Sequence, residues 1–390
     1  MSQARSLNLI ELMIKIGNFK FLLEYLNVVI IRTHGEFMAK IKDIAQRAGV
    51  SLSAVSIAMN GKRGLSITTR ERILKIAHEL DYHSSRQEKY PGVIRFLKIA
   101  LHGNTVNENH SIFINGYIDG MIEQAGKLKF SLEVAHYQGI SVEQIVEKQS
   151  SLQPVQGVII LGTEFEQADF SALKNIKVPF VIIDNINDFL PYDFVNINNR
   201  GAVFKILHHF QRSGLTQIGL ITSFAHTPNF QQREAAFREL VGQVGLAFDN
   251  RDTLSVNSTL EDAYQAMKHY LAAGKPLAQG YFCVNDIIAC GCLKALKEYG
   301  LRIPEDISLI GFDDLPISAV IEPPLTTIQV FNKKLGAAAV DLLYQRISLG
   351  KSSSHTNILI CGALIKRASV QIKSHGLPHQ ESLSGYSHPR

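Results

Sequence analysis

From about Phe96 onward, short apolar runs alternate with amphipathic segments that have a helical period. The apolar runs, which we expect to be buried strands, read FLKIALH, FSLEVA, GVIILG, FVIID, QIGLIT, GYFCV and ISLIGFDD. The expected helices run from about Ser111 to Lys127, Val142 to Ser151, Asn199 to Arg212, Phe230 to Val244, Leu260 to Ala272 and Ile287 to Tyr299. Strands and helices in alternation predict a parallel sheet covered on both faces. The alternation is too long for one simple sheet, so we expect two doubly wound lobes.

The stretch from Lys40 to Tyr82 differs, with three short helical patterns and two tight connections. The first pattern places apolar side chains on one helix face, at Ile41, Ile44, Ala45 and Ala48. Gly49 can take the positive φ of a tight turn, and Ser51 is a good N-cap for a second helix. The inward face of that helix would hold Val55, Ala58 and Met59, which leaves Leu52, Ser53, Ser56 and Ile57 pointing outward.

The third pattern opens at Thr68, which has capping-box spacing with Glu71. It carries Ile73, Ile76, Ala77 and Leu80 at the same period. Basic residues are concentrated in this region: between Met38 and Phe96 there are eleven Lys or Arg residues and five acids, a formal charge of +6, against +5 for the whole chain. A helix-turn-helix with a supporting helix and this charge predicts binding to DNA phosphates.

Residue identities in this region also resemble a known family. The agreeing positions are Lys42-Asp43-Ile44-Ala45, Ala48-Gly49-Val50-Ser51, Ala54-Val55-Ser56, Asn60-Gly61, Ser66, Thr69-Arg70 and Leu80-Asp81-Tyr82. They look like the headpiece signature of the LacI/GalR family of bacterial transcriptional regulators. The alternative is an ordinary three-helix surface module.

The resemblance covers about residues 39 to 370 and implies a regulatory domain similar to periplasmic sugar-binding proteins. It rests there on segments such as Val181-Ile182-Ile183-Asp184, Pro304-Glu305-Asp306-Ile307-Ser308 and Pro324-Leu325-Thr326-Thr327-Ile328. The implied fold is a small all-α helix-turn-helix headpiece followed by a bilobal α/β domain with two doubly wound parallel sheets. We expect a DNA-binding domain over 38–83, a linker or hinge over 84–96, a bilobal effector-binding and dimerisation domain over 97–373, and a polar tail over 374–390.

The first 37 residues contain the apolar run NFKFLLEYLNVVIIR, which Lys20 and Glu24 interrupt. It is too short to span a bilayer, which takes about twenty residues, and no small-residue cleavage site follows. We expect Met38 to be the physiological start, with residues 1–37 belonging to an over-long reading frame. The alternative is a real amphipathic extension that packs on the headpiece. Without a membrane or export segment, the expected location is the cytoplasm.

The linker HSSRQEKYPGVIRF is polar and basic, without a strong period. In the family this stretch forms a hinge helix whose leucine wedges into the DNA minor groove. A gapless count from Tyr82 places Pro91 at the wedge position, and a proline inside a helix removes a backbone hydrogen bond. We therefore expect a hinge helix that is short or absent.

Polar residues follow several expected strands, where open α/β sheets bind their ligands. Asp184 ends FVIID, Asn285 ends GYFCVN and Asp313 ends ISLIGFD, while Arg233 lies in the opening turns of a helix. Alone, each is more often a cap or turn residue. All four match effector-binding positions of the family, and Phe113 would add an apolar wall or else core packing. Asp286 and Asp314 are expected to be cap and turn residues.

Carboxylates, an amide and a guanidinium suit a polyhydroxylated small molecule. We expect a sugar, and nucleobases and nucleosides remain open. No cofactor or metal is expected, because Cys283, Cys290, Cys292 and Cys361 have no paired spacing and no nearby His cluster. These cysteines are expected to be reduced and mostly buried.

On the DNA side, the resemblance assigns base-edge positions to Leu52, Ser53 and Ile57. Ile57 cannot form a hydrogen bond with a base, although it can touch a thymine methyl group. Ser56, Asn60, Thr69 and Arg70 match positions that contact or position the phosphates. The alternative for Leu52 is packing on a neighbouring helix.

The sequence therefore predicts a cytoplasmic, ligand-responsive repressor that binds a pseudo-palindromic double-stranded operator as a homodimer, with a tetramer as the larger alternative. A solute-binding protein of a transport system would share the bilobal domain, but it would not need the helix-turn-helix. An enzyme is not expected, since there is no G-x-S-x-G elbow, phosphate-binding glycine loop or metal-ligand cluster.

Overall fold

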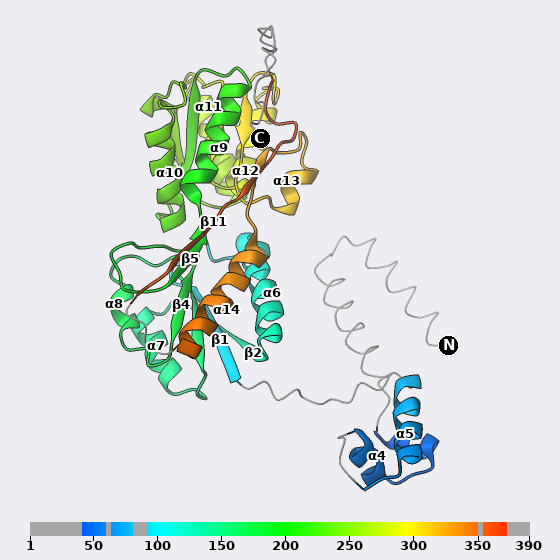
Figure 1. The fold of residues 1–390 in the computed structure, drawn as a ribbon. Coiled ribbons are helices and arrows are strands. Elements are labelled where there is room, and N and C mark those ends of the chain that lie inside the picture. The colour runs from blue at the N-terminus through cyan, green and yellow to red at the C-terminus, as the bar shows by residue number, and fades with distance from the viewer. Residues whose placement is uncertain (1–40, 60–63, 81–91, 350–353, 373–390) are drawn as a thin grey trace, which may run out of the picture. The chain divides into compact units, whose positions relative to one another are not determined.

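The computed structural model describes residues 41–59, 64–80, 92–349 and 354–372. The chain divides into two compact units at residues 89 and 90, and each unit is treated by itself (Figure 1). The expectations for residues 1–37, Asn60, Pro91 and the tail 374–390 lie outside the described residues. Among the described residues, no helix is both long and apolar enough to cross a membrane.

The smaller unit is the helix-turn-helix headpiece. Its helices are α3 (Ile41–Ala48), α4 (Leu52–Met59) and α5 (Ile67–Glu79). Their shared core is formed by the buried side chains of Ile44, Ala45, Ala48, Val55, Ala58, Ile73 and Ala77. Gly49 takes a φ of 63°, and the Ala54 amide donates to Ser51 Oγ at 3.2 Å, so the expected turn and cap are confirmed.

The start of the third helix differs from the expectation. Helix α5 begins at Ile67, and Ser66 Oγ accepts a hydrogen bond from the Thr69 amide at 3.2 Å. Ser66 therefore occupies the capping position that the sequence had suggested for Thr68. A serine one residue before the first helical residue satisfies an amide that the helix itself leaves unpaired.

The larger unit contains two parallel sheets, one in each lobe, which confirms the expected fold class. The first lobe has the strand order β11-β5-β4-β3-β1-β2. These strands are β1 (Gly92–Ala100), β2 (Phe130–Gln138), β3 (Gly157–Leu161), β4 (Phe180–Ile183), β5 (Phe194–Ile197) and β11 (Asn357–Ile360). One face packs on α6 (Ser111–Lys127) and α14 (Asn332–Leu349), and the other on α7 (Val142–Ser150) and α8 (Phe170–Leu173).

The second lobe has the strand order β7-β6-β8-β9. Its strands are β6 (Ile218–Ser223), β7 (Thr253–Val256), β8 (Gly280–Cys283) and β9 (Ser308–Ile310). Its helices are α9 (Asn199–Arg212), α10 (Pro228–Leu240), α11 (Leu260–Ala272), α12 (Asp286–Glu298) and α13 (Pro316–Val320). In Figure 1 this lobe lies above the first, with β5 and β11 leading towards it.

Three chain connections join the lobes. The chain passes from β5 to α9, returns through β10 (Thr327–Gln329) to α14, and crosses again from β11 to β12 (Ala363–Ile365). Strands β10 and β12 pair antiparallel as a separate two-stranded ribbon. The connections bring the carboxyl ends of both parallel sheets to the junction between the lobes.

The linker ends earlier than the boundary at residue 96. Strand β1 begins at Gly92, and it pairs with β2 from Gly92 onward. Ile94 and Phe96 are fully buried, and Arg95 donates to Glu133 Oε2 at 2.8 Å. Residues 92–96 therefore belong to the first sheet, because their apolar side chains have a core to fill and their arginine has a carboxylate partner.

Candidate functional site

A small cavity lies between the two lobes, and all five candidate ligand residues line it. Its volume is ≈ 40 Å³, enough for about one or two water molecules. The lining residues are Thr105, His110, Phe113, Ile114, Thr163, Asp184, Thr227, Asn229, Phe230, Arg233, Asn285 and Asp313. The first six of these residues, Thr105 to Asp184, come from the first lobe, and the last six, Thr227 to Asp313, come from the second lobe. Residues distant in sequence thus meet at one point.

The two carboxylates of the cavity sit on strained backbone. Asp184 follows β4 with a φ of 66°, and Asp313 follows β9 with a φ of 115°. Residues other than glycine adopt such conformations at a cost of about 1–3 kcal/mol each. Strain of this kind is found mainly at ligand sites, so both positions have the character of functional residues.

Asp184 is held by three donors. Its carboxylate accepts hydrogen bonds from Tyr117 Oη at 2.8 Å, Thr163 Oγ1 at 2.6 Å and Asn229 Nδ2 at 2.8 Å. Burial raises the pKa of Asp184, although these donors favour the charged form. Because Asn229 belongs to the second lobe, its bond to Asp184 also ties the lobes together.

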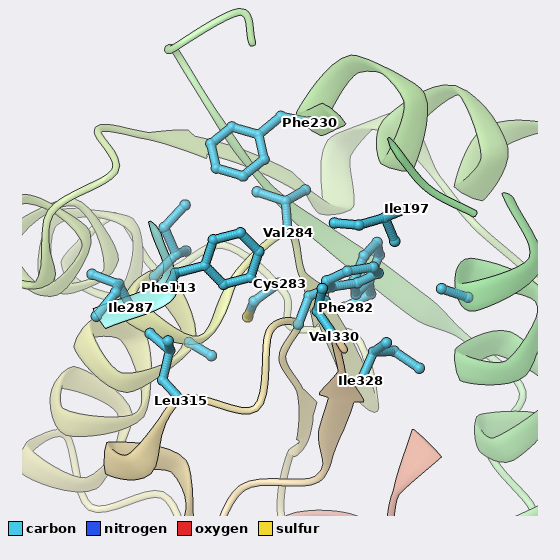
Figure 2. Close-up of a cluster of buried hydrophobic side chains, with 14 of the residues drawn as sticks. Phe113, Ile197, Phe230, Phe282, Cys283, Val284, Ile287, Leu315, Ile328 and Val330 are labelled. Carbon is cyan, nitrogen blue, oxygen red and sulfur yellow. The ribbon is translucent and has the colours of Figure 1, made fainter. Parts of the chain in front are cut away.

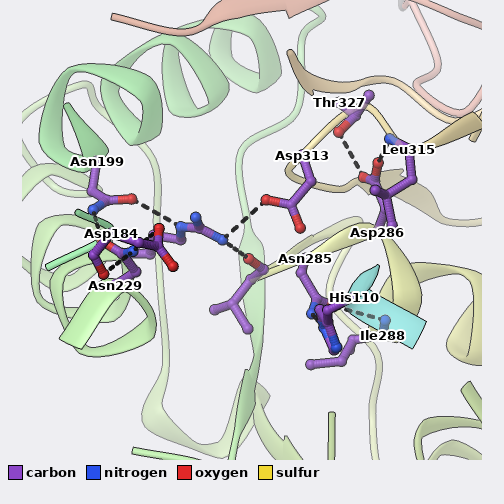
Figure 3. Close-up of polar contacts among 12 residues, drawn as sticks. His110, Asp184, Asn199, Asn229, Asn285, Asp286, Ile288, Asp313, Leu315 and Thr327 are labelled. Carbon is purple, nitrogen blue, oxygen red and sulfur yellow. Dashed lines mark hydrogen bonds and ion pairs between the residues drawn. The ribbon is translucent and has the colours of Figure 1, made fainter. Parts of the chain in front are cut away.

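Arg233 is buried and interacts with Asn199 and Asp313, whose side chains are labelled in Figure 3. Its Nε donates to Asn199 Oδ1 at 2.9 Å and its Nη1 donates to the Val284 carbonyl at 2.6 Å. The guanidinium carbon lies 3.6 Å from the centroid of the Phe312 ring, close enough for a cation–π interaction. Burial lowers the pKa of Arg233, while the nearby Asp313 carboxylate opposes that effect.

Asp313 has an unfilled acceptor. Its Oδ1 lies 3.6 Å from Arg233 Nη1, which is an ion-pair distance and too long for a hydrogen bond. That oxygen is buried and has no hydrogen-bond partner among the described residues. Burial raises the pKa of Asp313 well above its ordinary value. A buried carboxylate oxygen without a donor favours a ligand that brings one.

Asn285 combines a capping role with a contact across the lobes. Its Oδ1 accepts from the Ile288 amide at 2.8 Å, so Asn285 is the N-cap of α12. Its Nδ2 lies 3.1 Å from His110 Nε2, and burial lowers the pKa of His110 to about 4. The imidazole is therefore neutral at pH 7 and accepts that hydrogen bond.

The expectation that Asp286 caps this helix is wrong. Asp286 is the first residue of α12, and its buried carboxylate accepts from the Leu315 amide at 2.8 Å, Ser318 Oγ at 2.6 Å and Thr327 Oγ1 at 2.6 Å. Burial raises its pKa to about 6. Asp286 thus fixes the segment that follows Asp313. Asp314 takes a φ of 57° and pairs with Arg367 at 2.6 Å, as suits a turn residue.

Aromatic rings supply the apolar part of the site. Phe113 and Phe230 are buried and line the cavity, and Figure 2 shows both rings among the buried hydrophobic side chains. The ring of Phe113 meets Tyr117 edge to face, with centroids 5.3 Å apart. Flat apolar walls beside a few polar groups are typical of small-molecule sites.

The sequence analysis did not identify several residues in or next to the site. Asn229 and His110 line the cavity and Tyr117 donates to Asp184, but nothing in their local sequence marks them. Glu164 is 2% exposed, lies just after β3, and accepts from the amides of Thr105 and Val106, both at 2.9 Å. Glu164 lies three residues after the end of β3, as Asp313 lies three residues after the end of β9, so the same pattern could have identified it.

On the headpiece, Leu52 is 54% exposed, Ser53 and Ser56 are exposed, and Ile57 is half-buried. Ser53 Oγ lies 2.8 Å from Ser51 Oγ. Arg70 Nη1 donates to the Ala58 carbonyl at 3.2 Å, and Thr69 Oγ1 lies 2.7 Å from Ser66 Oγ. The outward positions of α4 are thus exposed or half-buried, and Thr69 and Arg70 have structural partners in the headpiece.

Within the described ranges, no cluster of three or more His, Cys, Asp or Glu side chains could hold a metal ion. The cysteines Cys283, Cys290 and Cys292 are buried and Cys361 is exposed, and all four are free thiols.

Comparison with known proteins followed the same division of the chain. Residues 40–85 match the family described as bacterial regulatory proteins, lacI family, and residues 207–370 match the periplasmic binding protein-like domain. The transcriptional repressor PurR of Pasteurella multocida is 30% identical over 340 residues, covering 86% of this chain and 99% of its own length. The transcriptional regulator GalR of Lacticaseibacillus casei is 30% identical over 320 residues, covering 80% of this chain and 93% of its own length.

Two solved structures share the fold. A Lac repressor dimer bound to operator and the anti-inducer ONPF has a TM-score of 0.63 and 24% identity, covering 86% of this chain and 99% of that chain. A complex of the transcriptional regulator CelR with cellobiose has a TM-score of 0.63 and 22% identity, covering 85% of this chain and 99% of that chain.

Proposed function

Because this chain belongs to the lacI family of bacterial regulatory proteins, we propose that it is a transcriptional repressor whose operator affinity depends on a small molecule bound between its two lobes. The proposal that a ligand binds in the cavity rests on the buried Oδ1 of Asp313, which has no hydrogen-bond donor among the described residues. A ligand hydroxyl or N–H group would satisfy it. The alternative, a solute-binding protein of a transport system, leaves the lacI-family segment at 40–85 without a role.

The proposed ligand is a polyhydroxylated molecule, with a sugar preferred. The cavity lining holds two carboxyl groups and one guanidinium, so it has no excess of positive charge to offset a strongly anionic ligand. Hydroxyl groups can donate to Asp313 and accept from Asn285, and a sugar ring can lie against Phe113. The same five residues, Phe113, Asp184, Arg233, Asn285 and Asp313, remain our proposed binding residues.

Ligand entry would require the lobes to separate, because the cavity holds only about one or two water molecules as it stands. The hydrogen bonds that would have to break include those from Asn229 to the Asp184 carboxylate and carbonyl and the one between Asn285 and His110. Ligand binding would then change the balance between more open and more closed arrangements, and only a difference in ligand affinity between them can alter DNA binding.

For DNA, we propose that residues 38–83 form the binding domain, and that the exposed face of α4 enters the major groove. Leu52, Ser53 and Ile57 would face base edges, while Ser56, Asn60, Thr69 and Arg70 would contact or position phosphates. A homodimer would place two such helices about one DNA turn apart, on a pseudo-palindromic operator. The bilobal domain, which begins with β1 at Gly92 and extends to about residue 373, would provide ligand binding and dimerisation, in the cytoplasm and without enzymatic turnover.

Two assays test this function. In a gel shift with the DNA upstream of the chain's own gene, we expect sequence-selective binding that weakens steeply with salt. In a thermal-shift screen of sugars and nucleosides, we expect at least one compound to stabilise the wild-type chain and to lose that effect in Asp313→Asn. DNA binding without sequence selectivity would contradict the repressor role, and a full response in the variant would contradict the cavity as the ligand site.

A further inference from the structure

A second, larger hollow lies between the lobes. It consists of two adjoining depressions of ≈ 550 Å³ and ≈ 410 Å³, which share Ile186, Asn187 and Gln232. We call the two depressions together the interlobe groove. Small-molecule sites have volumes of about 300–1,000 Å³, so this groove is large enough for a ligand as it stands. The cavity described above, at ≈ 40 Å³, is not.

The groove adjoins the cavity, and a thin wall of residues separates them. At three places the chain passes from the lining of one to the lining of the other within two residues: 163–165, 184–185 and 227–228. The wall between them includes the hydrogen bonds from Asn229 Nδ2 to the Asp184 carboxylate at 2.8 Å and to the Asp184 carbonyl at 3.1 Å. Asp184 belongs to the first lobe and Asn229 to the second, so parting of the lobes would open this wall and join the two spaces.

Amide side chains line the groove, and several of their NH₂ groups can donate hydrogen bonds to a ligand. Gln167 Oε1 accepts from Asn187 Nδ2 at 2.7 Å, and Gln232 Oε1 accepts from Asn199 Nδ2 at 3.0 Å. Both glutamines act only as acceptors in these bonds, so their NH₂ groups do not take part in them. Gln231 is exposed and forms no side-chain hydrogen bond within the described ranges. Amides that can both donate and accept match the hydroxyl groups of a sugar.

The groove also has an exposed aromatic ring at its edge and few charged residues in its lining. Phe189 is 93% exposed at the groove edge, where it offers a flat apolar face. The charged lining residues are Glu166, Asp188 and Arg200, and Arg200 already pairs with Glu239 at 2.6 Å. With no group of free cations in its lining, the groove is not suited to a phosphorylated ligand.

We propose that the ligand of this chain is a disaccharide or longer saccharide that binds after the lobes part, with one sugar ring in the enlarged cavity and the next in the interlobe groove. This inference rests on the proposed function and adds the size and class of its ligand. A single sugar would use only the cavity, whereas a second ring would also use the amides and the phenyl face of the groove. Both lobes contribute to the groove, so the second ring would also influence how the lobes close.

The first test compares disaccharides with their parts. Isothermal titration calorimetry on the full chain would use maltose, cellobiose, lactose, sucrose and trehalose, each beside its component monosaccharides, together with a set of nucleosides. We expect the tightest-binding disaccharide to exceed each of its components by at least roughly tenfold, or about 1.4 kcal/mol. A monosaccharide that binds as tightly, a nucleoside that binds more tightly, or no binding by any disaccharide overturns the proposal.

The second test uses variants of exposed groove residues, which are not expected to disturb folding. Gln231→Ala and Phe189→Ala should each weaken disaccharide binding by roughly threefold to tenfold and leave monosaccharide binding unchanged. Gln211→Ala, an exposed glutamine in α9 outside the groove, is the matched control and should change neither. Unchanged disaccharide binding in both groove variants overturns the inference.

These outcomes separate the two proposals. If a monosaccharide binds, depends on Asp313 and alters DNA binding, the proposed function stands and the disaccharide inference fails. If a disaccharide binds through Gln231 and Asp313 but leaves DNA binding unaltered, the ligand class stands and the proposed regulation fails.

Discussion

Replacing Glu164 by glutamine should destabilise the larger unit, although the two side chains have nearly the same shape. Oε1 of Glu164 accepts from the amides of Thr105 and Val106 at 2.9 Å each, and Oε2 accepts from the amides of His102 and Gly103 at 3.0 Å each. Glutamine has one oxygen and one NH₂ group, so in either orientation the NH₂ group faces two backbone N–H groups. Two backbone donors therefore lose their acceptor.

The expected magnitude follows from those two donors. A hydrogen bond to a charged acceptor contributes about 1.5–3 kcal/mol, so the loss of two amounts to about 3–6 kcal/mol. Glutamine no longer carries a buried charge, which offsets part of that loss. We therefore expect the free energy of unfolding to fall by about 2–4 kcal/mol in Glu164→Gln.

The effect should depend on pH. Burial alone would raise the pKa of Glu164, but the surrounding backbone amides outweigh burial and lower it. A lowered folded-state pKa stabilises the fold above the unfolded pKa, and this contribution is lost as the pH falls through the folded-state pKa. The difference between wild type and variant should be full at pH 7 and should shrink below about pH 4.

Urea unfolding followed by far-UV circular dichroism measures this, since the chain has no tryptophan. Glu147→Gln, an exposed glutamate on α7, is the control and should change the free energy by no more than about 0.5 kcal/mol. A Glu164→Gln chain as stable as wild type at pH 7, or a difference that persists unchanged into acid, would refute the reasoning.

Three further predictions concern other parts of the chain. The pKa of His110 is lowered to about 4, so the folded state resists protonation and loses stability as the pH falls below the unfolded value of 6.5. His110→Gln, which keeps an acceptor for Asn285, should remove about 3 kcal/mol of that acid-induced loss between pH 7 and pH 4, as urea unfolding at several pH values would show. In native alkylation followed by mass spectrometry, Cys361 should react and the three buried cysteines should not, because burial raises their pKa values; rapid labelling of a buried cysteine would contradict this. Ile44→Ala should cost the headpiece about 2–5 kcal/mol and abolish DNA binding while leaving ligand binding intact, whereas Leu52→Ala should leave folding unchanged and alter sequence preference in a gel shift.

Local patterns in the sequence were enough to predict most of the long elements. The helical period placed α6, α9 and α11 at their observed bounds, because each presents one continuous apolar face to a sheet. Helix α14 and the short strands β10 and β12 were not predicted. Three-residue strands have too few residues to show alternation, and both form only where the chain crosses between the lobes.

The candidate site was predictable to the extent that its residues have a local signature. Asp184, Asn285 and Asp313 follow apolar strands, and the structure brings all three to one cavity. Asn229 and Tyr117 have no such signature, because their roles depend on which helix faces Asp184 after folding. Their part in ligand binding, like that of the five candidates, stays a prediction.

The assignment of the helix cap at Asn285 shows the limit of this reasoning in detail. Both Asn285 and Asp286 are good capping residues by type. The backbone of Asn285 is extended, with a φ of −153°, so its side chain reaches the Ile288 amide. The carboxylate of Asp286 instead meets Thr327 and Ser318, which arrive from distant parts of the chain and which no local pattern could reveal.

The central claim is that occupancy of the cavity alters DNA binding. It is tested most directly by measuring the dissociation constant for the chain's own upstream DNA with and without the saccharide that binds best, in the wild type and in Asp313→Asn. The account predicts a change of roughly 5–150-fold in the wild type and none in the variant. An operator affinity that stays the same while the saccharide is bound, or a variant that no longer binds the saccharide yet still responds to it, would contradict the account.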